Sequence, residues 1–318
     1  MNFSNIMGAL FPIFFVLALG YLAGKRNTFD ADQAAGFSKL ALSFALPASL
    51  FVSMTDIPRD LLLGQGRLVL ALILSHVGLF LIAWIALRQV ASLRGTPAII
   101  YSLMLATSAT PVFGLAVLEP ILGASSAGAV GLVALAINLT VPLAVVLLEM
   151  DAAARNRVAG TTTTSTANPV TTGLKAGLKS PLLWGPLLGI AVVVAKIHVS
   201  SVVTSSLELI GAATSGVAVF SVGLVLAAHP VQLSAGVFAG SLARVAVQAT
   251  MLFILLRVLL VQSPFSRAAL ISCSFPLATV VVLFAARYKS AQSEAASMLL
   301  ISTLALAVTV PTMLWITR

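Results

Sequence analysis

Long apolar stretches separated by short polar connections dominate the chain. Ten of them approach or exceed the roughly 20 apolar residues that an α-helix needs to cross a bilayer. They lack the alternation of apolar and polar residues that is typical of outer-membrane barrel strands, so we expect helices. The ten predicted spans are Met7–Gly24, Phe37–Met54, Gly66–Leu87, Ala98–Pro120, Ala127–Glu149, Ser180–Lys196, Ser205–Ala228, Gly236–Val261, Arg267–Ala286 and Ala291–Ile316.

The composition supports this interpretation and excludes most other classes of protein. Apolar residues make up 59% of the 318 residues and charged residues only 8%, whereas a soluble domain carries about 25% charged residues. The formal net charge of +9 therefore marks membrane topology, and we expect no nucleic-acid partner. A single cysteine, Cys273, excludes an internal disulfide framework and Cys-based zinc sites. Since no enzyme motif is present, we expect neither catalysis nor a cofactor.

The basic residues between the spans predict the orientation of the chain. If the N-terminus lies outside, ten basic residues fall in cytoplasmic loops and six in outer segments. The excess favours a protein of the cytoplasmic membrane with both termini outside. The cytoplasmic set is Lys25, Arg26, Arg88, Arg94, Arg155, Arg157, Lys175, Lys179, Arg287 and Lys289, and the outer set is Arg59, Arg67, Lys196, Arg257, Arg267 and Arg318.

One long polar segment, residues 151–179, divides the spans into five plus five. Its run of Thr and Ser residues at 161–166 is typical of a flexible cytoplasmic linker. Residues 1–150 then form a first five-helix repeat and residues 180–318 a second. Landmark residues recur across the linker at separations of 165 to 174 positions: Pro12 with Pro186, Pro47 with Gly216, Pro111 with Pro276, and Pro142 with Pro311.

An odd number of spans per repeat means that the second repeat enters the membrane inverted. Inverted repeats with broken helices at corresponding positions are typical of secondary transporters, with the substrate site at the repeat interface. The predicted fold is therefore an all-α membrane protein with ten transmembrane helices in two inverted five-helix repeats, in which spans four and nine are broken.

Proline and hydroxyl residues mark the two breaks. Each proline removes a helical hydrogen bond, and the freed carbonyls must be satisfied within the protein or line a wet cavity. The pair indicates either ordinary kinks or a substrate site with exposed backbone. The candidate residues for such a site are Thr107, Ser108, Thr110 and Pro111 in span four, and Ser274 and Pro276 in span nine.

Arg244 lies about 12 Å inside span eight at 1.5 Å per residue, and a mid-helix arginine costs at least ~2.5 kcal/mol to insert. It either binds a carboxylate in bidentate geometry or donates to carbonyls that the breaks expose. Gln248 shares its helix face. Asn138 and His76 are central in spans five and three, where each lines the site or bridges neighbouring helices. No predicted span buries a carboxylate, which weakens any proton relay through Asp or Glu.

With these residues in place, the chain resembles the auxin efflux carrier family, in particular its bacterial malonate-transporter-like branch. The matching segments extend along nearly the whole chain, and their number and order carry the resemblance. They are Phe11–Phe15 and Gly20–Leu22 in span one, Leu42–Phe51 in span two, Asn138 and Pro142 in span five, Phe220–Gly223 in span seven, and Pro276 with Ala286–Tyr288 in span nine.

The resemblance implies a dimerising scaffold of spans one, two, six and seven. It implies a moving transport domain of spans three to five and eight to ten, working as an elevator, with spans four and nine crossing at Pro111 and Pro276. A small carboxylate would bind beneath the crossing, and Arg244 would occupy a position at which many members carry Lys. One departure is that Thr107, Ser108 and Thr110 stand where an Asn is common.

The partners that follow are a small carboxylate, membrane lipid and a second copy of the chain. The small-residue stretch Gly211–Gly216 favours close helix approach, either in a homodimer or within one protomer. Two alternatives stay open. A sodium-coupled symporter of the bile-acid type would need amide or acidic ligands near the crossing. A channel or receptor would need rings of charge or a filter-like loop.

Overall fold

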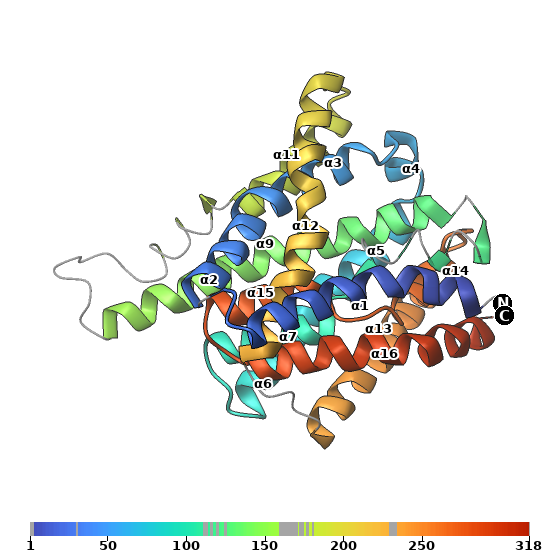
Figure 1. Ribbon diagram of the computed structural model, residues 1–318. Helices are drawn as coiled ribbons and strands as arrows, with labels where there is room; N and C mark the ends of the chain where they lie inside the picture. Colours follow the sequence, from blue (N-terminus) through green and yellow to red (C-terminus); the bar gives the residue numbers. More distant parts are fainter. Residues whose placement is uncertain are drawn as a thin grey trace.

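The architecture is helical throughout the part of the chain that the computed structural model describes, which contains no strand. The description leaves out residues 1–2, 30, 111–113, 115–116, 119–120, 124–125, 159–170, 172–174, 176–177, 180, 229–233 and 318. The helices, labelled in Figure 1, pack as two groups that contact each other.

Four helices in the described ranges are long and apolar enough to cross a membrane, and they identify a multi-pass membrane protein. They are Gly66–Gln89, Gly128–Arg155, Ala235–Val258 and Gln292–Ile316. Five shorter apolar helices accompany them: Phe14–Lys25, Ala41–Val52, Thr96–Ala106, Ser201–Ala213 and Val219–Ala228. The count of ten spans and their inverted arrangement stay predictions.

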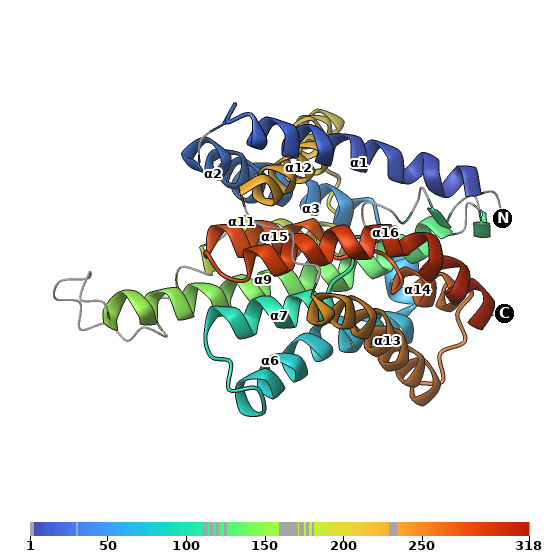
Figure 2. The same cartoon turned by 60° about the horizontal axis from the view of Figure 1, so that its bottom comes forward.

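The first group contains the helices of predicted spans one, two, six and seven. α1 packs along α12, and α3 packs against both α11 and α12. Figure 2 shows α1, α2 and α12 as a layer above α16 and α15. The members are α1 (Phe3–Lys25), α2 (Ala31–Leu40), the π-helical turn η1 (Ala41–Ala45), α3 (Leu46–Thr55), α11 (Pro181–Val194) and α12 (Ser201–Ala228).

Glycines allow α1 and α12 to approach each other closely. A methyl group added to Gly20 would collide with the backbone of Phe220, and one added to Gly223 would collide with the backbone of Leu17 and Tyr21. In lipid, where the hydrophobic effect does not drive helices together, such close packing is a main source of helix association.

The second group contains the helices of predicted spans three to five and eight to ten. α13 packs against α16, α7 and η2, and α9 packs against α5, α7 and α14. α9, α15 and α16 carry the contacts with the first group. The members are α5 (Gly66–Ile73), the π-helical turn η2 (Leu74–Gly78), α6 (Leu79–Gln89), α7 (Thr96–Ala106), α9 (Ser126–Val158), α13 (Ala235–Val258), α14 (Ser266–Ser272), α15 (Thr279–Arg287) and α16 (Gln292–Ile316), and the short α4 (Arg59–Gly64) precedes α5.

Helix α9 continues eight residues into the segment that the sequence predicts as linker, because its last turns carry a polar network. Asp151 accepts from the backbone N–H of Thr96 at 2.8 Å and from its hydroxyl at 2.6 Å. Arg155 pairs with Asp151 at 3.2 Å and donates to the Thr96 hydroxyl at 2.8 Å. The carboxylate thus caps the first turn of α7, where helical N–H groups lack partners.

A second polar contact at the same end joins α9 to the segment that follows α15. Glu149 accepts from the Tyr288 hydroxyl at 2.6 Å and pairs with Arg287 at 3.1 Å. Burial, and then the hydrogen bond to Glu149, raises the pKa of the Tyr288 phenol above its usual range, so it stays a donor. Together the two contacts hold the ends of α7, α9 and α15 in register.

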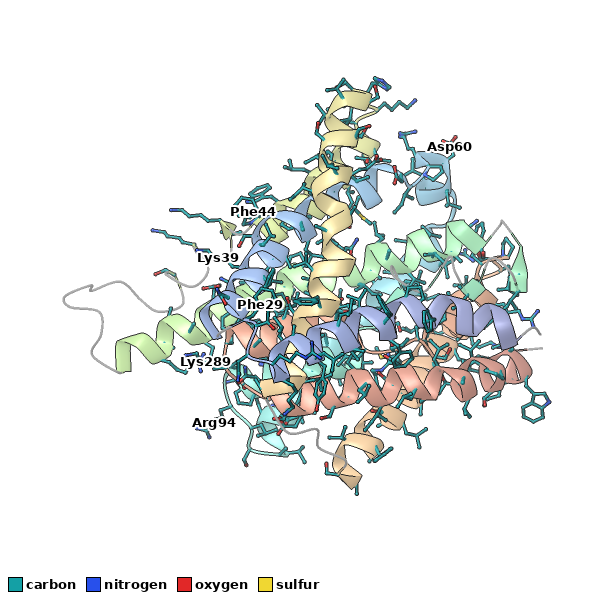
Figure 3. The ribbon with its side chains drawn as sticks, in the orientation of Figure 1. Phe29, Lys39, Phe44, Asp60, Arg94 and Lys289 are labelled. Carbon is teal, nitrogen blue, oxygen red and sulfur yellow. The ribbon has the colours of Figure 1, made fainter. Side chains whose placement is uncertain are left out.

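Basic side chains gather at this end of the molecule. Lys39, Arg94 and Lys289 lie on the side where α1 ends and α16 begins, and Asp60 lies far from them (Figure 3). The first turn of α1 and the last turn of α16 lie together at the opposite side (Figures 1 and 2).

Candidate functional site

Two interrupted helices meet inside the second group. α7 ends at Ala106 and continues into Thr107 with extended backbone, φ −120° and ψ 145°. α14 ends at Ser272, and α15 resumes the helix at Thr279. The N–H of Ala109 donates to the carbonyl of Pro276 at 2.8 Å. The two unwound segments are therefore in direct contact, as breaks in helices must be when lipid offers no hydrogen-bond partner.

Arg244 of α13 joins the two breaks. Its side chain is fully buried, and its Nη1 donates to the carbonyl of Thr107 at 3.3 Å. Its Nη2 donates to the carbonyl of Phe275. Of the two roles that the sequence left open for Arg244, donation to exposed carbonyls is thus present in the structure. The planar guanidinium can bind both carbonyls at once because its N–H groups diverge in a fixed fork.

Gln248 lies one turn further along α13 and extends the same contact. Its Nε2 donates to the carbonyl of Ala106 at 3.3 Å. Three hydrogen bonds from two adjacent turns of α13 therefore reach the end of α7 and the break in span nine. The shared helix face of Arg244 and Gln248, predicted from their spacing, makes this possible.

Hydroxyl groups satisfy much of the remaining backbone. The Thr107 hydroxyl donates to the Leu103 carbonyl at 2.7 Å, and the Ser274 hydroxyl donates to the Ile271 carbonyl at 2.6 Å. Both hydroxyls therefore bind carbonyls of the helix turn that precedes them. Ser108 and Thr110 share a hydrogen bond of 2.8 Å. Side chains of this type offer backbone groups an alternative to helical bonds, which stabilises an unwound segment.

Two residues of α16 also support the break in span nine, and sequence reasoning missed them. The Ser302 hydroxyl accepts from the Leu277 N–H at 3.0 Å, and the Thr309 hydroxyl donates to the Ser274 carbonyl at 3.1 Å. The available signal was the presence of hydroxyl residues within the apolar run of span ten. Their partners could not be read from it, because serine and threonine occur widely in membrane helices.

A second set of polar side chains lies on η2, which packs against the helix of Arg244. His76 is 1% exposed, its Nδ1 lies 3.0 Å from the Leu72 carbonyl, and its ring is within electrostatic range of Arg244. A π-turn inside an α-helix often marks a functional position. Four buried atoms here have no hydrogen-bond partner among the described residues: Arg244 Nε, Gln248 Oε1, His76 Nε2 and Ser75 Oγ.

Unsatisfied polar groups are rare in protein interiors, because each costs about 1–3 kcal/mol. Four of them on neighbouring elements therefore indicate a place where a polar ligand or ordered water binds. The described open groove of about 560 Å³ lies elsewhere, between the start of α5 and the segment after α13. The candidate site is therefore the buried polar cluster of Arg244, Gln248, His76 and Ser75, and not that groove.

Three further predicted site residues are Asn138, Pro276 and Pro111. Asn138 is buried in α9, which packs against α7, η2 and α14. Pro276 lies in the break of span nine, with its carbonyl bonded to Ala109. Pro111 lies outside the described residues. The structure thus brings Thr107, Pro276, Arg244 and Gln248 together through hydrogen bonds to the backbone of the two breaks.

Comparisons with known proteins agree with a transport fold. Residues 5–315 match the model of a family described as membrane transport protein. The chain is 29% identical over 315 residues to the uncharacterized transporter YfdV of Escherichia coli K12, with 98% of each chain covered. The same identity and coverage hold for the YfdV proteins of Escherichia coli O157:H7 and Shigella flexneri.

Proposed function

The chain belongs to the membrane transport protein family, which is the auxin efflux carrier family that its sequence resembles, and from this premise we propose that it carries small organic carboxylates across the cytoplasmic membrane by alternating access. It is a multi-pass transporter rather than an enzyme. The chemistry of the buried polar cluster supports a malonate-like anion as the cargo.

The observation that carries the proposal is the buried charge of Arg244. Arg155 and Arg287 form ion pairs with carboxylates at the end of α9, but Arg244 has only neutral carbonyl partners in the described chain. A buried cation is costly unless it is paired. Its Nε–H still lacks an acceptor. An anionic substrate would supply both the countercharge and the acceptor.

Carboxylates fit these donors better than larger anions do. A carboxylate has two oxygens that accept charge-assisted hydrogen bonds from a guanidinium. The hydroxyls of Ser108 and Thr110 lie on the same unwound segment as the Thr107 carbonyl and would bind further oxygens after a small rotation. The cluster is bounded by buried apolar residues of α7, α14 and α15, which favours a small substrate.

Alternating access would move the second helix group against the first. The two groups meet through α9, α15 and α16, and the breaks that hold the candidate site lie wholly within the second group. The contact between the breaks would therefore travel as a unit. The proposal includes ten spans in two inverted repeats, residues 1–150 and 180–318, joined by the linker 151–179.

We propose that both termini lie outside. The side that carries Lys39, Arg94 and Lys289 (Figure 3) would be cytoplasmic by the excess of basic residues. The first turn of α1 and the last turn of α16 lie on the other side. Labelling a cysteine introduced at the end of α16 with a membrane-impermeant reagent, in a Cys273→Ser background, checks this orientation. Labelling that requires permeabilised cells would reverse it.

The proposed oligomer is a homodimer formed by the first helix group. Part of the small-residue stretch serves the protomer, because Gly211 packs against Ser49 of α3, whereas Gly216 has no heavy atom within 4 Å of an added Cβ. The free glycine supports a role for this part of α12 between copies. Native mass spectrometry in mild detergent should give a dimer, and a monomer alone would count against it.

A thermal-shift screen of the purified protein tests the substrate class. Malonate and other small mono- and dicarboxylates would be compared with their neutral amides, each with and without sodium. A carboxylate present at 100 times its dissociation constant stabilises the folded state by about 2.7 kcal/mol, and the matched amide should not. Equal shifts for acid and amide would exclude Arg244 as the anion site, and a strict need for sodium would favour the sodium symporter.

A further inference from the structure

The tautomer of His76 follows from its contact with α5. Nδ1 lies 3.0 Å from the Leu72 carbonyl. A carbonyl oxygen only accepts, so Nδ1 carries the hydrogen and Nε2 of the neutral ring presents a lone pair. That nitrogen has no hydrogen-bond partner among the described residues, and the side chain is buried. His76 therefore holds an unused proton acceptor deep in the second helix group.

The electrostatic surroundings of this acceptor are simple. The elements packed against η2 are α5, α6, α7, α9 and α13. Of these, α13 presents Arg244 within electrostatic range. The thiol of Cys273, the residue after α14, is also within electrostatic range of Arg244. Tyr101 lies midway along α7. The other charged residues of these elements lie toward helix ends: Arg67, Arg88, Glu149, Asp151, Arg155 and Arg257.

A proton on His76 alone would create two neighbouring buried cations. In a low-dielectric interior their repulsion is strong, so the free site disfavours protonation. A carboxylate bound between them reverses this preference, because it attracts both cations. The Arg244 Nε–H and a protonated His76 Nε2–H would then each have an acceptor. Proton and anion thus favour each other's binding, and such coupling is reciprocal.

We propose that His76 is the proton site of this transporter and that one proton binds Nε2 with each carboxylate. The inference rests on the proposed function. A proton from water adds to the Nε2 lone pair, and the resulting imidazolium donates to one carboxylate oxygen while Arg244 donates to another. No bond of the substrate breaks. After the site opens to the other side, the anion leaves and the proton returns to water. With neutral His76, the free site carries the single positive charge of Arg244. With protonated His76 and a bound monocarboxylate, the site carries the same net charge. A monocarboxylate therefore crosses together with its proton without net movement of charge.

Calorimetry measures this coupling directly. Malonate is titrated into the purified protein at several pH values from 6.5 to 8.5, each in two buffers with different ionisation enthalpies, so that the heat reports the protons taken up. For one linked proton the affinity of the wild-type protein should fall about tenfold per pH unit. In His76→Gln, whose amide can still donate to Leu72, the affinity should depend only on the ionisation of malonate.

The matched control is His198→Gln, because His198 is exposed in the loop before α12. It should take up protons as the wild type does. His76→Asn replaces His76→Gln if the latter is not monodisperse. Malonate binding without proton uptake, or proton uptake that survives in the His76 variant, would overturn the inference and leave the proposed function standing. Failure of wild type to bind malonate or any acid of the screen would remove the proposed function and the inference with it.

Discussion

Replacing Arg244 by alanine tests the contact between the two broken helices. The substitution leaves the carbonyls of Thr107 and Phe275 without their charged donor. Each buried carbonyl that loses its partner costs about 1–3 kcal/mol, so the free energy of unfolding should fall by about 2–6 kcal/mol. The cavity left by a fully buried side chain adds to this loss. Removing a buried charge offsets part of it.

Two variants calibrate the result. Arg244→Lys keeps the charge but not the planar fork, so it should retain one of the two carbonyl contacts and lose about half as much stability. Arg257→Ala removes an exposed arginine from the same helix, where the guanidinium lies 5.1 Å from the ring centre of Phe253. That contact is worth about 0.5–1 kcal/mol at an exposed site, so this variant should melt close to wild type.

Melting temperature and malonate affinity should be measured on the same detergent preparation. If Arg244 also binds the substrate, the folded fraction of Arg244→Ala should lose about ten- to hundred-fold in affinity, the equivalent of one charge-assisted bond of roughly 1.5–3 kcal/mol. A wild-type melting temperature would refute the stabilising contact. Wild-type affinity in a destabilised Arg244→Ala would refute the anion site alone.

Three further substitutions test the rest of the architecture. Pro276→Ala should impair uptake into proteoliposomes while leaving expression intact, because alanine lets the helix close across the Ala109 contact. The control is Pro12→Ala, in the exposed part of α1. Equal uptake by both variants would contradict the prediction. Gly20→Ala should force α1 away from α12 and lower the free energy of unfolding by about 1–3 kcal/mol, as measured by thermal melting. The control is Gly36→Ala, whose added methyl group meets no atom within 4 Å and should stabilise α2 slightly. Asp151→Ala should remove the cap on α7 and lower stability by about 1 kcal/mol, whereas Asp151→Asn, which keeps an acceptor for the Thr96 N–H, should lose less; equal losses would show that the ion pair with Arg155 matters more than the cap.

Much of the helical structure was predictable from local properties of the chain. The transfer of apolar side chains out of water identifies the spans residue by residue, without reference to the rest of the molecule. The break in span nine was predictable for a similar reason, since Pro276 cannot donate a helical hydrogen bond. The position of Arg244 within an apolar run marked it as a candidate site residue before any neighbour was known.

Helix ends followed less well from hydropathy. α9 passes the predicted boundary at residue 151 because Asp151 and Arg155 bind Thr96, 55 residues or more away in the chain. The π-turns η1 and η2 leave no mark in the hydrophobic pattern, although η2 carries His76. The extension of α9 depends on a partner from another helix, which hydropathy does not report.

Hydropathy and the positions of the prolines were enough to predict a helical membrane protein with two interrupted spans and an arginine too deep to lie without a partner. The tertiary structure decided the partners: Ala109 with Pro276, and Arg244 with the carbonyls of both breaks. It also placed the buried ring of His76 within electrostatic range of that arginine. The division has one physical cause. Partition between water and lipid acts on each segment separately, whereas a freed carbonyl or a buried cation is satisfied only by groups that packing brings from distant parts of the chain.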